Sequence, residues 1–420
     1  MELMNQPFTG QLGNRLIELL DSSDYHTLNI AVAFAKNSGV LRIKDSLERF
    51  RKQGGKVNVY VGVDLGGTSY EALTALLLHT DSLNVVHSET GQTFHPKIYQ
   101  FVGKDKGLLV VGSHNLTGGG LWTNFESSVL IPVDGSGAND VKILKGLDDY
   151  IENLTLLKDS FMSIGAQDDI HKLLQNGYIF NEAIEQIRRA KAATQDGALG
   201  RLFGDGAPAK LPRLTIPKSK KAASVFAAPA SPISPPQSDA DQTIWFETRK
   251  MTGGSRNILD LSMKSLVESG DPTGTYFDLG EPGFMQGGVM FFGLNPTDTA
   301  KGKDITINFE GVDYAGNTIL FPDGEKANGT WRLQVKGENS SKVKITETFK
   351  DLNTAEAERY GAKGELLLYL QFKIITFAKI QDDYYFMSVF SESELENFRE
   401  VSRITARNGR TNQARQLGLL

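Results

Sequence analysis

The chain has 420 residues, of which 40% are hydrophobic and 23% charged, with a formal net charge of −5 and no cysteine. This length and composition predict a folded protein of two or three domains and exclude disulfides, thiol nucleophiles and cysteine-ligated zinc. The negative net charge argues against a protein that coats nucleic acid non-specifically, because such binding needs many lysines and arginines, so any contact with DNA must be local.

The first part of the chain alternates strand-like and helical patterns. Apolar strand-like runs lie at residues 28–35, 56–63, 83–89, 108–113 and 127–133, with helical patterns between the earlier ones. Several of these runs show little polar alternation, as expected of strands that helices cover on both faces. We therefore expect an α/β domain over residues 1–203, completed by helices near 139–158 and 167–193.

The sequence VDLGGT at residues 63–68 has two interpretations. It resembles the first phosphate loop of hexokinase-like sugar kinases, in which glycines let the backbone approach a phosphate. The following residues predict a helix rather than the hairpin that such kinases need, so we expect a strand, a tight turn and a helix capped by Thr68 or Ser69. His79 and His87 have no partner at a metal-ligand spacing and are expected to be core or surface residues.

Two short segments concentrate groups that can handle a phosphate. His95-Pro96-Lys97 opens an extended run, in which residues two apart project from one face. The next apolar strand ends in Gly112-Ser113-His114-Asn115, and Glu126 follows a glycine-rich loop. A histidine can act as nucleophile or general acid, lysine and asparagine can hold non-bridging oxygens, and a carboxylate can orient the histidine, so this set suits phosphoryl transfer without a metal.

Taken together, HPK, GSHN and the following acid resemble the HxK and GSxN signature of the phospholipase D superfamily, over roughly residues 25–135, and more narrowly its restriction endonucleases. The resemblance implies five site residues: His95, Lys97, Ser113, Asn115 and Glu126. Many members carry an aspartate five residues after the lysine, where this chain has Val102, so Glu126 is the candidate that orients His95. The departure disfavours the lipid-cleaving branch, and His114 is expected to face away from the site.

The single copy of the motif predicts how the site is completed. The mechanism implied by the resemblance uses two histidines, so we expect a homodimer that shares one active site across a two-fold axis. One His95 attacks phosphorus to give a phosphohistidine, its twin protonates the leaving oxygen, and water hydrolyses the intermediate. No cofactor and no metal ion are expected.

A change of composition separates the second half of the chain. Residues 204–241 are rich in proline, alanine and serine and predict a linker, whose lysines either serve solubility or approach a polyanion. From residue 242 to residue 420, strand-like runs recur between glycine-rich turns and favour a β-barrel or sandwich. These runs lie at residues 304–311, 317–324, 330–337, 342–349, 365–377 and 384–390.

The second domain contains two candidate DNA-binding segments, each rich in arginine, amide and hydroxyl side chains. Its position after a nuclease-like domain resembles that of the B3-like pseudobarrel of some of these endonucleases, which grips the major groove with two arms. We expect the contacts from Arg249, Lys250, Thr252, Ser255, Arg256, Asn257, Asn328, Thr330, Trp331 and Arg332. Each segment is equally compatible with an ordinary solvent-exposed hairpin, and Trp331 with a core position. The arginine-rich tail, residues 399–415, either touches backbone phosphates or lies in solvent.

These observations predict a type II-like restriction endonuclease subunit that acts on double-stranded DNA. Some relatives need a separate helicase-like ATPase, and this chain has no GxxxxGK[ST] loop, so such a partner stays open. The alternative is a catalytically inactive DNA-binding or scaffold protein with a phospholipase-D-like fold. A lipid phosphodiesterase is disfavoured by the single motif. With no basic stretch before an apolar run at the start and no apolar run of about 18 residues, we expect a cytoplasmic protein without membrane contact.

Overall fold

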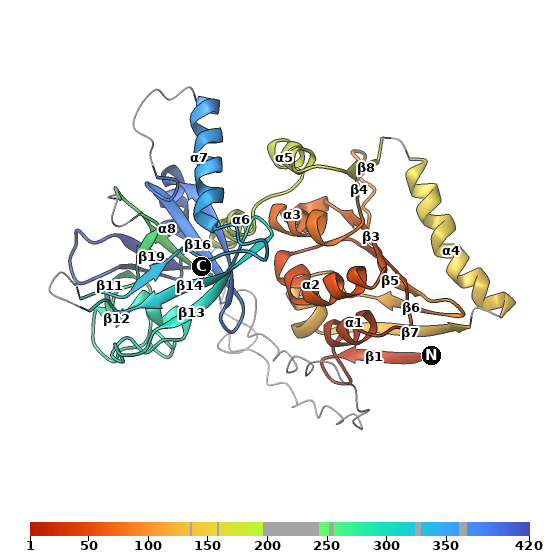
Figure 1. Cartoon of the computed structure of the whole chain (residues 1–420), viewed down its shortest axis with the longest axis horizontal. Coiled ribbons are helices and arrows are strands. Elements are labelled where there is room, and N and C mark those ends of the chain that lie inside the picture. The colour runs from red at the N-terminus through yellow and green to blue at the C-terminus, as the bar shows by residue number, and fades with distance from the viewer. Residues whose placement is uncertain (135–136, 158, 196–242, 252–255, 324–328, 361–367) are drawn as a thin grey trace. The chain divides into compact units, whose positions relative to one another are not determined.

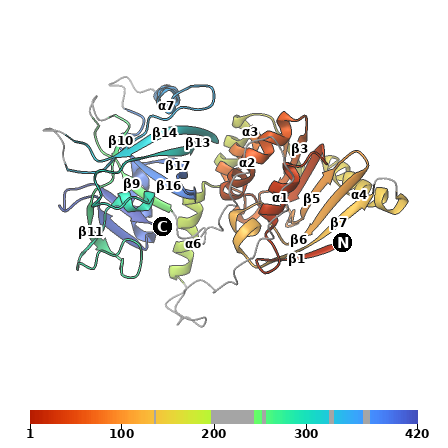
Figure 2. The same ribbon diagram turned by 60° about the horizontal axis from the view of Figure 1, so that its bottom comes forward.

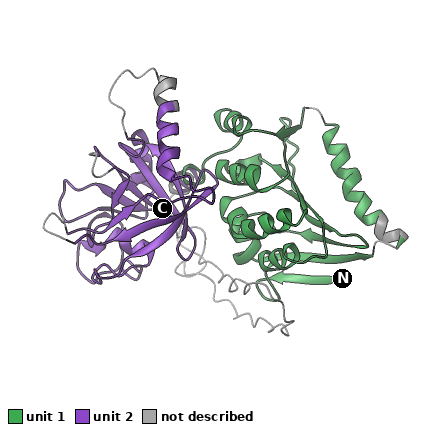
Figure 3. Cartoon of the chain, viewed as in Figure 1, with its two compact units in different colours: residues 1–185, 199–239 green, residues 186–198, 240–420 purple. Residues whose placement is uncertain are grey.

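The structure is a computed structural model, which describes the chain except residues 135–136, 158, 196–242, 252–255, 324–328 and 361–367. The described residues form two compact units, one of residues 1–185 and the other of residues 186–195 and 243–420 (Figure 3). The predicted linker, residues 204–241, lies outside the described residues. Within the described parts of the chain, no helix is long and apolar enough to cross a membrane.

The first unit is built on an eight-stranded mixed sheet (Figure 1). Its strands are β1 (Glu2–Gln6), β2 (Thr27–Val32), β3 (Lys56–Gly62), β4 (Ser82–Val86), β5 (Lys97–Val102), β6 (Lys106–Gly112), β7 (Glu126–Asp134) and β8 (Phe161–Ile164). They are ordered β1-β7-β6-β5-β2-β3-β4-β8. Strands β2, β3 and β4 are parallel, and the remaining pairs are antiparallel. This arrangement confirms the predicted α/β class of the first part of the chain.

Helices cover the two faces of this sheet unequally (Figures 1 and 2). The helices of the unit are α1 (Leu12–Leu20), α2 (Asn37–Lys52), α3 (Tyr70–His79), α4 (Ala138–Thr155), α5 (Gln167–Gln175) and the start of α6 (Glu182–Gln195). Helices α1, α2 and α3 pack on one face, and α4 lies over the other. The Ser69 side chain accepts a hydrogen bond from the Ala72 N–H and caps α3, as predicted for the VDLGGT segment.

The face under α4 carries a row of polar side chains instead of a continuous apolar core. Asn58 Nδ2 donates to Asn29 Oδ1 over 2.9 Å, and Asn29 Nδ2 donates to Gln100 Oε1 over 2.7 Å. Gln100 Nε2 in turn donates to the Leu144 carbonyl of α4 over 3.1 Å. Because amide side chains satisfy one another here, α4 is held partly by hydrogen bonds, while its Leu154 packs against Ala31, Val86 and Phe94 elsewhere on the same face.

The second unit is mainly β and contains an eleven-stranded sheet among its described residues. The strands are β9 (Thr243–Glu247), β10 (Ile258–Asp260), β11 (Lys264–Ser269), β12 (Phe284–Gln286), β13 (Lys303–Phe309), β14 (Val312–Leu320), β15 (Arg332–Gln334), β16 (Lys373–Gln381), β17 (Tyr384–Ser391), β18 (Ile404–Arg407) and β19 (Gln416–Leu419). Their order is β10-β15-β14-β13-β17-β16-β9-β19-β18-β11-β12. Strands β10 and β11 stand near opposite ends of this order although few residues separate them in the chain, so the sheet must curve back towards itself.

One predicted strand of this unit is a helix. Residues 342–349, KVKITETF, were expected to be extended because Val, Ile and Thr favour strands, but α7 (Ile345–Tyr360) begins inside them. Ile345 and Phe349 are four residues apart and both buried, so they form the apolar side of the helix. Burial of this side outweighed the local β preference. A shorter helix, α8 (Leu395–Val401), packs through Phe398 against Trp245.

Candidate active site

The ends of six strands bring the predicted catalytic residues to one edge of the first sheet. The parallel strands β2, β3 and β4 end at this edge. Strand β5 runs antiparallel to β2 and starts there, with Lys97 opposite Val32. Strand β6 ends and β7 begins at the same edge, with Gly112 opposite Ser128. His95, Lys97, Ser113, Asn115 and Glu126 therefore converge although 31 positions separate the first from the last.

His95 and Lys97 form the centre of the site. His95 is exposed and lies just before β5, and Lys97 is the first residue of that strand. Lys97 Nζ lies 2.7 Å from Nδ1 and 3.0 Å from Nε2 of His95, and it also donates to the His95 carbonyl over 3.1 Å. An ammonium has no lone pair, so the ring nitrogen that accepts from it must be unprotonated. The predicted meeting of imidazole and ammonium is present.

The charge on Lys97 is set by two opposing effects. Its side chain is largely buried, and loss of water lowers the pKa of the ammonium below its usual value, while the carboxylate of Glu126 acts in the opposite direction. Glu126 therefore supports the charged form of Lys97. Within the described residues, no group of three or more histidine, cysteine, aspartate or glutamate side chains could hold a metal ion.

Asn115 is held by the backbone of the neighbouring strand end. Its Oδ1 accepts from the Phe34 N–H over 3.2 Å, and the Leu116 N–H donates to the Phe34 carbonyl over 3.0 Å. With the amide oxygen bonded in this way, the NH₂ group is the end of the side chain that can donate to a phosphate oxygen. The ring of Phe34 also stands edge-on to His95, with centroids 5.8 Å apart.

Glu126 has different partners from those predicted. One carboxylate oxygen accepts from Ser113 Oγ, and the other accepts from Asn124 Nδ2 over 3.2 Å. Both ring nitrogens of His95 lie against Lys97, so the expected contact of Glu126 with His95 is replaced by an electrostatic effect on Lys97. Ser113 is thereby a positioning residue for the carboxylate, since its Oγ also accepts from the Ser127 N–H over 3.1 Å.

His114 faces the interior, as predicted. It is 1% exposed, and neither ring nitrogen has a hydrogen-bond partner. Burial lowers the pKa of its imidazole to about 4. The residue is therefore a neutral core side chain between two site residues, and it takes no part in proton transfer at this edge.

A carboxylate that sequence reasoning missed fixes the segment that carries His95. Asp64 Oδ2 accepts from the Phe94 N–H over 3.2 Å, and Asp64 Oδ1 lies 2.8 Å from Nδ1 of His87. On the other side of His95, the Pro96 carbonyl accepts from the Ala33 N–H over 2.8 Å. The sequence predicted only a core or surface position for His87, and its contact with Asp64 adds to that prediction. Both Asp64 and His87 follow parallel neighbouring strands, and that shared edge is the signal that could have paired them.

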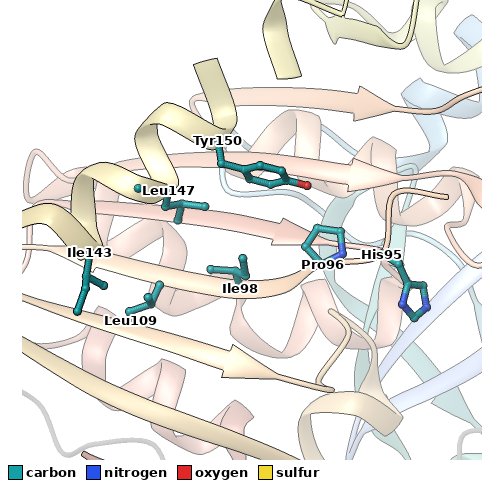
Figure 4. A pocket seen from close by; sticks show the side chains of 8 residues that line it. His95, Pro96, Ile98, Leu109, Ile143, Leu147 and Tyr150 are labelled. Atoms are coloured by element: carbon teal, nitrogen blue, oxygen red, sulfur yellow. The ribbon is translucent and has the colours of Figure 1, made fainter. Parts of the chain in front are cut away.

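An open pocket of about 540 Å³ adjoins His95 on the α4 side of the sheet (Figure 4). Ile98 of β5 and Leu109 of β6 form its floor. The wall from α4 consists of Ile143, Gly146, Leu147 and Tyr150. Pro96 and His95 complete the lining. Among the described residues that line the pocket, His95 is the one ionisable side chain besides Tyr150, and the others are apolar.

The candidate DNA-binding residues of the second unit have varied surroundings. Thr252, Ser255 and Asn328 lie outside the described residues. Lys250 and Arg256 are exposed, Asn257 and Thr330 are partly buried, and Arg249 donates to Glu247 and to the Gln413 carbonyl, both over 2.9 Å. In the antiparallel pair of β10 and β15, Ile258 faces Gln334 and Asp260 faces Arg332. The first candidate segment precedes β10 and the second leads into β15, so they enter this antiparallel pair of strands from opposite ends.

Trp331 is a core residue and not a DNA contact. It is 0% exposed, its Nε1 donates to the Pro296 carbonyl over 2.9 Å, and Phe321 packs edge-on against it. Arg332 is also constrained, because its Nε lies 3.9 Å from an oxygen of Asp260. Arg415 lies 4.0 Å from the other oxygen of that carboxylate. The predicted second arm therefore loses its aromatic member.

No protein-family model matches the sequence, and no curated protein matches it as a relative. Among solved structures, the chain is similar to the phospholipase D family member Nuc from Salmonella typhimurium, at 15% identity and a TM-score of 0.28, over 39% of this chain and 97% of that one. NucT from Helicobacter pylori gives 18% identity and a TM-score of 0.27, over 39% and 98%. Phosphatidylserine synthase from Haemophilus influenzae gives 11% and 0.31, over 46% and 47%. The chemistry must therefore be argued from the site residues themselves.

Proposed function

We propose that the chain is a DNA phosphodiesterase of the phospholipase D type, and more narrowly a sequence-specific restriction endonuclease subunit. The observation that carries the proposal is the convergence of the His95 imidazole, the Lys97 ammonium and the fixed Asn115 amide at one exposed sheet edge. A phosphodiester needs a nucleophile and donors for two non-bridging oxygens, and these three groups supply them.

The geometry suggests how the nucleophile is released. In the free protein, Lys97 donates towards the His95 ring. A bound phosphate offers anionic oxygens, which accept stronger hydrogen bonds than a neutral imidazole, so the ammonium turns to the phosphate and frees a ring nitrogen. That nitrogen forms a bond to phosphorus while the bond to the leaving oxygen breaks. Water then attacks phosphorus, the phosphorus–nitrogen bond breaks, and His95 returns to its neutral form.

The leaving oxygen needs a proton that His95 itself cannot give while it is the nucleophile. We propose that His95 of a second copy supplies it, in a homodimer that shares one active site. In this arrangement one imidazole forms the phosphohistidine and is released from phosphorus in the second step. The other imidazole acts first as an acid and then as a base: it donates a proton to the leaving oxygen and then accepts one from the attacking water. No metal ion takes part in this scheme.

The second unit is proposed to select the DNA sequence as a B3-like pseudobarrel. The exposed Lys250 and Arg256 and the neighbouring Arg249 and Asn257 support this role, because such side chains contact phosphates and base edges. A good bidentate contact contributes about 1–3 kcal/mol of discrimination between bases. A helicase-like ATPase partner is part of the proposal only if the chain does not cut alone.

The test is incubation of the full chain with mixed-sequence plasmid DNA in EDTA, and in Mg²⁺ with and without ATP. Discrete fragments in EDTA are expected, with His95→Ala at least about 1,000-fold slower. The matched control is His26→Ala, because His26 precedes β2 at the opposite edge and contacts Thr27. Alkaline quenching of the wild type should trap DNA on His95. DNA binding without cleavage or adduct in any tube favours the inactive DNA-binding protein instead.

A further inference from the structure

The pocket beside His95 has a composition that separates it from the phosphate-binding part of the site. Its lining, besides His95, is apolar or uncharged. A phosphate is held by cations and N–H donors, and Lys97 and Asn115, which provide them, are not in this lining. The pocket therefore fits the uncharged part of a substrate whose phosphate lies at His95.

The lining of the pocket suits a flat ring, because it joins the aromatic ring of Tyr150 to aliphatic side chains and a proline. Tyr150 of α4 and Pro96 both line it, and Ile98 and Leu109 line it from two neighbouring strands (Figure 4). Tyr150 and Ile143 are each 38% exposed, so the pocket is an open slot. Burial raises the pKa of the Tyr150 hydroxyl, which therefore stays protonated and can donate to a ring nitrogen or carbonyl.

We propose that this pocket binds a single nucleobase, that of the nucleotide next to the phosphate attacked by His95. The inference rests on the proposed DNA-cleaving function and adds a base-binding site to it. A base inside a duplex cannot reach the slot while it is stacked, so binding requires that it leave the helix, as enzymes that act on extruded nucleotides require. Stacking on aromatic side chains holds bases with little regard to their identity. The pocket therefore places the scissile phosphate without reading the sequence.

Gly146 allows the pocket to be filled without disturbing its walls. It lies within α4, lines the pocket, and a Cβ added there meets no heavy atom within 4 Å. Leucine is a better helix former than glycine, so Gly146→Leu should fold at least as well as the wild type while occupying the slot. Glu152→Leu is the matched control, because it adds the same side chain at an exposed position of α4 outside the lining.

The first measurement is kcat/KM for oligonucleotides cut at a mapped position, with either a normal base or an abasic site next to the scissile phosphate. We expect Gly146→Leu to lose about 5- to 100-fold on the normal substrate, the range of one lost stacking contact, and the wild type to lose as much on the abasic one. The variant on the abasic substrate should lose little more than either change alone. The proposal would be overturned if the losses in kcat/KM from the substitution and from the abasic site multiply, or if Gly146→Leu shows no loss. The control, Glu152→Leu, should match the wild type.

The second measurement does not depend on cleavage. Oligonucleotides with 2-aminopurine at successive positions are titrated with full-length His95→Ala, with and without Gly146→Leu. A change in fluorescence at one position that Gly146→Leu abolishes supports the base site. If the wild type nevertheless never cuts DNA, the proposed function fails and the base site stands. If no position shows a fluorescence change that Gly146→Leu removes, the base site is overturned, even if the wild type cuts DNA. A third outcome also overturns the base site. If Gly146→Leu loses hydrolysis of phosphatidylcholine vesicles but keeps its activity on DNA, the pocket binds an acyl chain.

Discussion

The buried histidine of the GSHN segment makes a quantitative prediction about stability and pH. The pKa of His114 is about 4 in the folded chain, because the imidazole is buried without hydrogen-bond partners, and about 6.5 in an unfolded chain. Between these values the unfolded chain binds more protons than the folded one, so stability falls as the pH falls from about 6.5 to about 4 and is then level. The difference in pKa corresponds to about 3 kcal/mol.

Replacement of His114 by leucine should remove this dependence. Urea unfolding of both full-length proteins at pH 4, 5, 6 and 7.5 gives the free energy of unfolding of each. At pH 7.5 the variant is expected to be as stable as the wild type or more so, since a buried group without partners is lost. At pH 4 its advantage should be larger by about 3 kcal/mol. Parallel pH profiles for the two proteins would refute the burial of an unpartnered imidazole at this position.

The other predictions concern the site edge and the second unit. Asp64→Asn leaves one side-chain oxygen for the two contacts of Asp64, with the Phe94 N–H and with His87, and so loosens the Phe94–His95 segment. It should lower kcat about 10-fold with little change in KM, and an unchanged kcat would contradict the positioning role. Glu126→Gln removes the charge that favours protonated Lys97, so the alkaline limb of the pH–rate profile should move to lower pH, and a shift in the opposite direction would exclude this role. Trp331→Ala should cost about 3–5 kcal/mol of unfolding free energy, measured with urea, whereas a loss of DNA affinity with stability unchanged would restore it as a contact.

The centre of the site could be predicted because it depends on local sequence and one rule of sheet topology. His95 and Lys97 begin a strand, Asn115 follows the end of the next, and Glu126 begins the one after that, so three consecutive antiparallel strands suffice to bring them together. Hydrophobic patterning identified these strands directly. The prediction that His114 faces away from the site followed from its position between two motif residues.

The parts that were missed depend on contacts between distant segments. Pairing of Asp64 with His87 requires the parallel register of β3 and β4, in which Gly62 faces Val86. The partners of Glu126 depend on side-chain rotamers, which no sequence pattern specifies. Trp331 stands in a segment whose local composition is that of an exposed turn, and the contacts that accompany its burial, with Phe321 and the Pro296 carbonyl, come from other segments of the chain.

The register of β5 also bears on the aspartate that the motif lacks. Val102, at the position in question, is the last residue of β5 and faces Thr27 and Gly107. At about 3.3 Å per residue it lies roughly 16 Å along the strand from Lys97, at the edge opposite the site. An aspartate there could not touch His95, whereas Asp64 holds the neighbouring Phe94 N–H and Glu126 supports Lys97 from the active edge. The absence of the motif aspartate therefore does not by itself favour the inactive alternative, and the two carboxylates at the site edge come from other segments, Asp64 after β3 and Glu126 at the start of β7.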